Sequence, residues 1–398
     1  MAERQTTRLR IPRGVYALGF VSLFMDVSSE MVHSLLPLFL VGTLGASALV
    51  VGLIDGLSEA VVSITKLFSG VISDWTGRRK PLLLAGYGLA ALTKPLFPLA
   101  DSAALILGAR LLDRFGKGLR GAPRDALVAD YTPVALRGAA YGLRQSMDTV
   151  GAFLGPLLAI GLMALGGNDI RYVFSWAVLP AALAVLTILI FVREPERTST
   201  AAPRRFPIRR EAVHELGPGY WIIIGLGSIM MMARFSEGFL LLRGQGAGLS
   251  ARWVPAILIL MNLAYALSAY PLGALADRLS RFRLLAASAV LLVFAEIALG
   301  FDSLGAILAG TVLWGLHMGA SQGLLTALIA DSAPEALRGT AFGIFNLVTG
   351  LVTLIASALA GLLWTVSGPS LAYSVGAGFA VASAIACLWL EKRPLRTH

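Results

Sequence analysis

Ionisable side chains at helical spacing inside apolar sequence are the residues of this chain most suited to chemistry. Arg110, Arg114, Lys117 and Arg124 follow one another at steps of four, three and seven residues. At 3.6 residues per turn, these steps place all four cations on one broad face of a helix. An ionised side chain at the centre of a bilayer costs at least about 2.5 kcal/mol, so this basic face should line a protein interior or an aqueous cavity.

Carboxylates occur at a similar depth in neighbouring apolar segments. Asp26 and Glu30 lie in the first segment, Asp55 and Glu59 in the second, and Asp148 in the fifth. These acids should largely neutralise the basic face. A carboxylate that loses its cation through movement can take up a proton, which is the physical basis of coupling. Glu30, Glu59 and Asp148 are the first candidates for proton coupling, Asp26 and Asp55 are nearby alternatives, and a structural ion pair is the competing role for each.

The bases that would hold or release these acids are Arg110, Arg114 and Lys117. The seventh apolar segment supplies a counterpart, because SSEM at 28–31 aligns with FSEG at 235–238 and thereby pairs Glu30 with Glu237. Facing acids suit a cationic ligand and the basic face suits an anionic one, so the sign of the substrate stays open. The substrate-cavity candidates are His33, Arg144, Arg234 (one helical turn before Glu237), Glu237, Asn262, Tyr265, His317, Gln322 and Asn346.

Composition indicates how these residues are held in place. The 398 residues have a mean hydropathy of +0.76, and only 14% are charged, which is too apolar for an ordinary soluble domain. Twelve segments are long enough to cross a bilayer. They fall at 14–42, 47–73, 80–99, 103–130, 137–166, 171–192, 219–243, 252–276, 283–301, 304–330, 338–365 and 369–390. The predicted fold is an all-α integral membrane protein.

The second half of the chain repeats the first. ALVADYTPVALRGAAYG at 126–142 returns as ALIADSAPEALRGTAFG at 327–343, with 11 of 17 residues identical at an offset of 201. A duplicated half-molecule explains this repeat. We therefore expect two pseudo-symmetric six-helix bundles, 1–192 and 219–398, joined by a basic cytoplasmic linker at 193–218.

The basic face is absent from the second half. At the same offset, Arg110, Arg114 and Lys117 correspond to Thr311, Gly315 and Met318. Proton binding is therefore expected in the first bundle.

Arginine and lysine concentrate in alternate loops. The clusters are Arg4, Arg8, Arg10 and Arg13; Arg78, Arg79 and Lys80; Arg278, Arg281 and Arg283; and Lys392, Arg393 and Arg396. The positive-inside rule then places both termini in the cytoplasm, and the bacterial cytoplasmic (inner) membrane is the expected location. The first apolar run is long enough to span and lacks a clear cleavage site, so no signal peptide is predicted.

A loop motif adds a resemblance to a known family. GVISDWTGRRK at 70–80 resembles the loop signature G-x-x-x-D-x-x-G-R-R/K of the major facilitator superfamily, and GALADRLSRFR at 273–283 is its degenerate copy. The resemblance implies the major facilitator fold and a cytoplasmic latch between the bundles, with Asp74, Arg78 and Asp130 favouring the outward-facing state. The latch residues are Gly70, Asp74, Gly77, Arg78, Arg79, Asp130, Arg137, Asp277, Arg281, Asp331 and Arg338.

The fifth apolar segment resembles the signature of the proton-coupled antiporter branch, which contains drug and metabolite exporters. Gly142, Gly151, Gly155 and Pro156 fit G-x8-G-x3-G-P, although the closing glycine pair is absent. Arg110 also sits where the family commonly has an arginine in its fourth helix. The resemblance implies a secondary transporter that exports a small molecule against protons by alternating access.

Other functions remain as alternatives. A proton-coupled importer of a charged metabolite would use the same fold and charges. Methionines and histidines at Met25, Met31, His33, Met230–Met232, His317 and Met318 suggest metal-ion transport as a weaker alternative. A membrane enzyme or receptor is disfavoured because no Walker loop, H-E-x-x-H motif or nucleophile site appears.

Neither a cofactor nor a resident metal site is predicted, and Cys387 is the single cysteine. The expected partners are a small-molecule substrate, protons and the lipid bilayer, with no nucleic acid, and the chain is expected to be a monomer.

Overall fold

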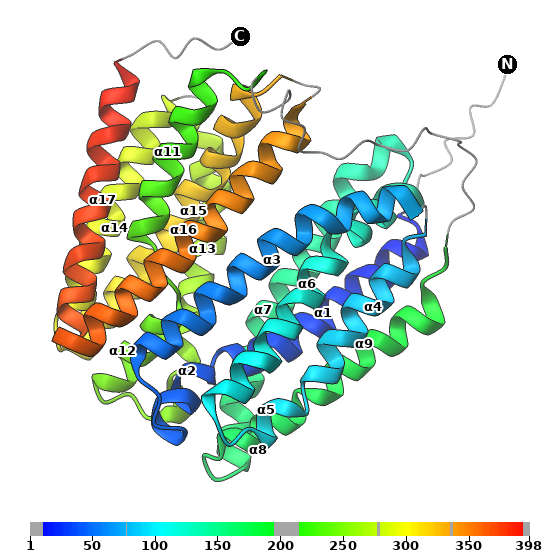
Figure 1. Cartoon of the computed structure of the whole chain (residues 1–398), viewed down its shortest axis with the longest axis horizontal. Helices are drawn as coiled ribbons and strands as arrows, with labels where there is room; N and C mark the ends of the chain where they lie inside the picture. The colour runs from blue at the N-terminus through cyan, green and yellow to red at the C-terminus, as the bar shows by residue number, and fades with distance from the viewer. Residues whose placement is uncertain (1–10, 77, 195–214, 277–278, 335–336, 393–398) are drawn as a thin grey trace, which may run out of the picture.

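The fold is two helical bundles standing side by side, the first drawn from blue to green and the second from green to red (Figure 1). This computed structural model describes residues 11–76, 78–194, 215–276, 279–334 and 337–392. Every regular element in these ranges is helical. The start of α1 (Arg13–His33) and the end of α17 (Pro369–Glu391) lie at the same end of the molecule (Figure 1). This end carries Arg79 and Arg281, and we call it the basic end and the opposite one the far end.

The first bundle contains six spans, three of which are interrupted. Its elements are α1 (Arg13–His33), α2 (Leu36–Leu38) and the π-helical turn η1 (Phe39–Thr43); α3 (Ala48–Thr76); α4 (Lys80–Thr93) and α5 (Leu96–Leu99); α6 (Ala103–Tyr131); the short 3₁₀ turn η2 (Val134–Leu136) before α7 (Arg137–Leu165); and α8 (Ile170–Trp176) with α9 (Val178–Phe191).

The second bundle repeats this plan. Its elements are α11 (Pro218–Ala233) and α12 (Gly238–Gly246); η3 (Ala251–Trp253) and α13 (Ala256–Leu275); α14 (Arg281–Gly300); α15 (Leu304–Ser332); α16 (Arg338–Ser367); and α17 (Pro369–Glu391). The predicted all-α architecture of twelve spans in two bundles is confirmed, with ends within a few residues of those expected.

One of the twelve spans differs in composition from the rest. Within the described ranges, 11 helices are long and apolar enough to cross a membrane by length and composition. The remaining span is α6, which has the required length but carries the basic face together with Asp113 and Asp125. Such a helix is compatible with a membrane because its neighbours α3, α4 and α7 cover it.

Small residues bring the two bundles into contact along α3 and α16, which run side by side (Figure 1). A Cβ added at Gly52 would lie 2.1 Å from the Ser357 carbonyl oxygen, and one at Gly361 would lie 2.7 Å from the Ala48 carbonyl oxygen. Small residues of this kind allow close helix approach in membranes. At the far end, α2 also contacts α12 and α7 contacts η3, so the bundles meet there.

The seventh span breaks where a continuous helix was expected. Residues 234–237 are not helical, and Arg234 has φ −105° and ψ 77°. The prediction that Arg234 lies one helical turn before Glu237 is therefore wrong. The first span is also interrupted, directly after His33. Interrupted helices expose backbone groups near the midplane, as is common at transporter sites.

Candidate functional site

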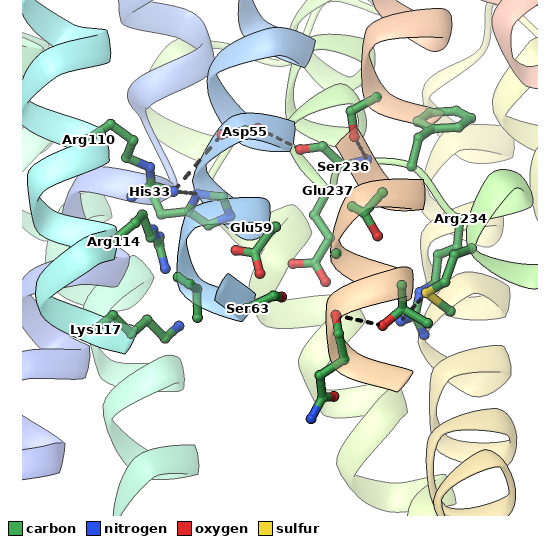
Figure 2. Close-up of a pocket in the computed structure, with 18 of the residues that line it drawn as sticks. His33, Asp55, Glu59, Ser63, Arg110, Arg114, Lys117, Arg234, Ser236 and Glu237 are labelled. Carbon is green, nitrogen blue, oxygen red and sulfur yellow. Dashed lines mark hydrogen bonds and ion pairs between the residues drawn. The ribbon is translucent and has the colours of Figure 1, made fainter. Parts of the chain in front are cut away.

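A cavity of about 500 Å³ lies between the bundles beside the break in the seventh span. Figure 2 shows the basic face of α6 on one side of this central cavity, Arg234 on the other, and Glu59 and Glu237 between them. The charged side chains that line it are Glu30, Asp55, Glu59, Lys66, Arg110, Arg114, Lys117, Arg234 and Glu237, together with His33. The cavity thus combines five cations with four carboxylates.

The cations of α6 are held at one wall with donors left over. The Arg110 Nη2 atom lies 2.9 Å from His33 Nδ1 and 4.0 Å from an Asp55 oxygen. Nε and Nη1 of Arg110 and Nε of Arg114 have no hydrogen-bond partner among the described residues. These buried donors favour an anionic group or water in the cavity, because a buried charged donor without a partner is costly.

Asp55 joins the two bundles. The Ser236 hydroxyl, in the break of the seventh span, donates a hydrogen bond of 2.5 Å to an Asp55 oxygen. The Ser236 amide donates to Ser357 Oγ of α16 at 3.1 Å. The broken segment is therefore fastened to α3 and α16 at once.

Three further carboxylates face the cavity without such fastening. Glu30, Glu59 and Glu237 line it, and within the described ranges none of them makes an ion pair within 4.0 Å. They are free to bind a proton, a cationic group or a neighbouring lysine. Proton-exchange chemistry requires such groups.

A second cavity of about 600 Å³ adjoins the first and shares Glu30, Lys66, Lys117 and Asn262 with it. Its other charged lining residues are Asp26, Arg120, Arg124, Asp125 and Asp148. Asp148 accepts from Arg144 Nη1 at 2.6 Å and lies 3.9 Å from Arg124 Nη1. Asp148 is thus an ion-paired group, unlike Glu30 and Glu59.

Glycines of α7 set the position of the first-span acids. A Cβ added at Gly155 would lie 2.5 Å from Glu30 Cβ, and one at Gly151 would lie 3.0 Å from Asp26 Cβ. A Cβ added at Gly142, the first glycine of the antiporter-like motif, would meet nothing within 4 Å. Two glycines of the motif therefore allow α7 to approach α1 beside both acids.

Most predicted site residues lie at one of the two cavities, and three do not. Those that line them are Asp26, Glu30, His33, Asp55, Glu59, Arg110, Arg114, Lys117, Asp148, Arg234, Glu237, Asn262, Tyr265 and Asn346. Arg144 lies behind Asp148, and Gln322 accepts from the Tyr265 hydroxyl at 3.2 Å. His317 is fully buried, and its Nδ1 atom lies 2.8 Å from the Ser288 carbonyl oxygen. This contact joins α15 to α14. His317 is thus a helix-joining group that lines neither of the two cavities described here, and its role at the substrate site stays a prediction.

Several lining residues were not among the predicted site residues. Lys66 lines both cavities, and Ser236, Thr353 and Ser357 line the first. Lys66 lies in the second span with Asp55 and Glu59, so its charge in an apolar segment was an available signal. Uncharged hydroxyls carry no such signal, because serine and threonine commonly bond to their own helix.

The predicted latch is only partly within the described ranges. Gly77, Asp277 and the Asp74 side chain lie outside them.

Two ion pairs lie at the basic end, one in each bundle. The Arg79 Nη1 atom lies 2.6 Å from Asp130 in the first bundle, and Arg281 pairs with Asp331 in the second bundle. The Glu194 carboxylate accepts from the backbone amides of Arg79 and Lys80 at 2.8 and 2.7 Å. Both ion pairs lie within a bundle, so the latch between bundles stays a prediction for another state.

Potential metal ligands are scattered through the described part of the chain, where no group of three or more His, Cys, Asp or Glu side chains could hold a metal ion.

Comparison with known proteins places this architecture in a family. The Major Facilitator Superfamily profile matches residues 18–262 and 245–398. An uncharacterised MFS-type transporter of Methanocaldococcus jannaschii is 32% identical over 395 residues, covering 96% of this chain and 95% of the relative. The multidrug resistance protein MdtH of Yersinia pestis is 34% identical over 150 residues, which is 38% of this chain and 37% of the relative.

A solved structure agrees at the level of the fold. The crystal structure of a peptide transporter POT in complex with sulfate superposes with a TM-score of 0.81 at 14% sequence identity, covering 97% of this chain and 96% of that one. The two pseudo-symmetric bundles, the profile match over both halves and the relative that matches almost end to end lead to one conclusion: the chain belongs to the Major Facilitator Superfamily and is a membrane transporter, not an enzyme.

Proposed function

We propose that this transporter exports a small molecule from the cytoplasm in exchange for protons, by alternating access. In this proposal the basic end and both termini face the cytoplasm of a bacterial cell, in agreement with the positive-inside rule. The protein acts as a monomer of two bundles, and residues 193–218 connect them.

The observation that carries the proposal is the set of Glu30, Glu59 and Glu237 around the central cavity. These carboxylates have no ion-pair partner among the described residues, yet they share the cavity with Arg114 and Lys117, and Glu59 and Glu237 point toward that basic wall (Figure 2). A carboxylate in such a site binds a proton when its cations are distant and releases it when a cation approaches. Rocking of the bundles changes these separations, and a bound ligand can do the same. Proton and substrate binding would then exclude one another, which is the requirement for exchange.

Alternating access needs contacts that open at one end while others form at the opposite end. At the far end, Asp55, Ser236 and Ser357 fasten α3 to the second bundle. We propose that these bonds break in the outward-facing state, when the basic ends of the two bundles come together and the latch segment with Asp74 and Arg78 engages the second bundle. The similarity to a multidrug resistance protein supports export as the direction.

The test is a transport assay in proteoliposomes with an imposed pH gradient. A pH-sensitive dye inside the vesicles would report proton movement when ethidium, or a member of a drug and metabolite panel, is added. We expect gradient-driven movement with the wild type and none with Glu30→Gln or Glu59→Gln. Both variants should still exchange substrate between compartments of equal pH, because only the coupling acid is lost.

Asp101→Asn is the matched control, because Asp101 is an exposed acid outside both cavities. This variant should transport like the wild type. If Glu30→Gln and Glu59→Gln both kept full gradient-driven transport, the assignment of proton coupling to this cavity would be rejected. Substrate and protons moving in the same direction would instead identify an importer.

A further inference from the structure

Among its described residues, the second bundle contains one acid that is neither at the cavity nor in an ion pair. Glu296 lies in the last two turns of α14 and has 0% exposure. Neither of its carboxyl oxygens has a hydrogen-bond partner among the described residues. Its carboxyl group lies flat against α17, where a Cβ added at Gly376 would meet Oε1 at 2.8 Å and Oε2 at 2.7 Å.

The neighbours of Glu296 are polar but uncharged. Tyr373 lies one helical turn before Gly376 on α17, and its hydroxyl is close enough to interact electrostatically with Glu296. The Tyr373 hydroxyl and the Trp314 Nε1 atom are also buried without a partner. No ion pair of the described residues involves Glu296. An ionised carboxylate would here lose its water without gaining a counter-charge, which costs far more than burying the neutral acid.

The charged groups on the surrounding helices are engaged elsewhere. Arg243 of α12 donates through Nε to the Leu299 carbonyl oxygen at 2.8 Å and through Nη1 to Asp302 at 3.1 Å. His317 of α15 is bonded to Ser288. The ionisable residues of α14 at its other end, Arg281 and Arg283, pair with Asp331 and Glu391.

An aromatic ring separates this acid from the central cavity. Phe235, in the break of the seventh span, lines the cavity. Its ring centroid lies 5.8 Å from that of Trp314 and 5.4 Å from that of Tyr373. Phe235 is therefore a cavity-lining side chain that contacts Tyr373, the neighbour of Glu296, and it sits in the non-helical segment 234–237 of that span.

We propose that Glu296 is a second proton-binding site, closed inside the second bundle and connected to the central cavity past Phe235. In the state described here the carboxyl group holds the proton, with Tyr373 as its uncharged polar neighbour. When the seventh span rearranges and Phe235 moves, the O–H bond of the acid breaks and its proton passes to cavity water. This site goes beyond the coupling acids of the first bundle and does not depend on the direction of transport.

Infrared spectroscopy of the purified protein tests the proposal directly. The spectrum of the wild type minus that of Glu296→Gln should contain the carbonyl stretch of one carboxylic acid at neutral and mildly alkaline pH. The matched control is Glu391→Gln, which removes a carboxylate paired with Arg283 in the same bundle. Its difference spectrum should contain ionised-carboxylate bands. Bands of an ionised carboxylate in the spectrum of the wild type minus that of Glu296→Gln would overturn the proposal.

Folding and exchange give two further outcomes. Glu296→Gln should fold as stably as the wild type, because glutamine reproduces the size and neutrality of the protonated acid. A variant that failed to fold would contradict a neutral Glu296.

After transfer to D₂O, the proton of the carboxylic acid should be replaced by deuterium at least tenfold faster in Phe235→Ala than in the wild type, as followed by the shift of the carboxylic-acid band. Phe239→Ala, which removes a ring packed on Phe235 but not lining the cavity, should leave the rate unchanged. Equal rates in wild type and Phe235→Ala would refute the route.

Discussion

Lys94 and Asp113 form the most deeply buried ion pair among the described residues. The Lys94 Nζ atom lies 2.9 Å from Asp113 Oδ1, and their side chains are 1% and 3% exposed. Lys94 also donates to Ser29 of α1 at 3.2 Å, so this pair joins α4, α6 and α1 behind the cavity. A buried pair of this kind adds little net stability, but removal of one partner leaves an uncompensated charge.

Lys94→Met should therefore reduce the free energy of unfolding by about 3–5 kcal/mol, because Asp113 loses its nearest cation. The double variant Lys94→Met/Asp113→Leu should recover a large part of that loss. Chemical unfolding in detergent, with the two single variants and the double variant in one cycle, would measure the coupling. Additive losses in the double variant would show that the pair is not the source of the effect.

The sequence predicted which ionisable residues gather but not how they pair. The spacing of Arg110, Arg114 and Lys117 predicted a shared face, and all three line the central cavity. Pairing depends on how helices rotate against one another, and glycine contacts such as Gly155 on Glu30 decide this. Glu296 was not singled out, because a lone acid in an apolar segment does not reveal which neighbour it faces.

The lengths of the apolar segments were sufficient to predict the membrane spans, whereas the interruptions within those spans were not predicted. The break at 234–237 has no proline, and its only signal is the glycine that follows at Gly238. Two tertiary bonds of Ser236 hold it: the backbone amide freed by the break donates to Ser357, and the side-chain hydroxyl donates to Asp55. Such bonds join residues more than a hundred positions apart, so local sequence cannot reveal them.

Ser236→Ala should open the far end of the transporter. A hydrogen bond to a charged group contributes about 1.5–3 kcal/mol, so its loss should shift the ratio of far-end-closed to far-end-open molecules by a factor of roughly ten to a hundred. Spin labels at Ser47 and Gln245, on opposite bundles beside the far-end groove, would report the distance. Ser228→Ala is the control, because that hydroxyl bonds only to Ile224 of its own helix. Identical distance distributions for both variants would contradict the role of Ser236.

Gly155→Ala tests the contact between α7 and α1. The added methyl group would meet Glu30 Cβ at 2.5 Å and the Val27 carbonyl oxygen at 2.9 Å, and overpacking of this kind costs about 1–3 kcal/mol. We expect a lower melting temperature together with weaker proton coupling, because Glu30 is displaced. Gly142→Ala on the same helix meets nothing within 4 Å and should be neutral or slightly stabilising. Equal stability of the two variants would show that the α7–α1 contact is not tight.

At the scale of the whole molecule, the two duplicated halves share one helical scaffold but differ in the ionisable side chains that it carries. The basic-end ion pairs Arg79–Asp130 and Arg281–Asp331 involve acids that correspond at the offset of 201, each paired with an arginine of the preceding loop motif. The cations of α6 have no counterparts in α15, where Trp314 and Met318 pack in the core. The repeat at an offset of 201 made the shared part predictable, whereas the contact surface between the bundles has no signature along the chain.

Membrane sidedness can be measured with two introduced cysteines. Ser280→Cys lies at the start of α14 near the basic end, and Ser303→Cys lies at the start of α15 at the far end. An impermeant maleimide added to intact cells should label only the second, because the basic end is proposed to be cytoplasmic. Labelling of Ser280→Cys alone would invert the orientation, and labelling of both would contradict the number of spans between them.

The charge inventory of the central cavity has an electrical consequence. With five cations and four carboxylates, the fully ionised lining carries one net positive charge, and each proton bound adds another. In a state closed at the far end and open at the basic end, the membrane voltage would fall mainly across the closed region, and the cavity would stand at the potential of the basic end. Reversal of access would carry the lining charge through most of the voltage, worth about 2.3 kcal/mol per elementary charge at 100 mV. The resting potential of the cell should thus bias which way the transporter faces, and more strongly after protonation.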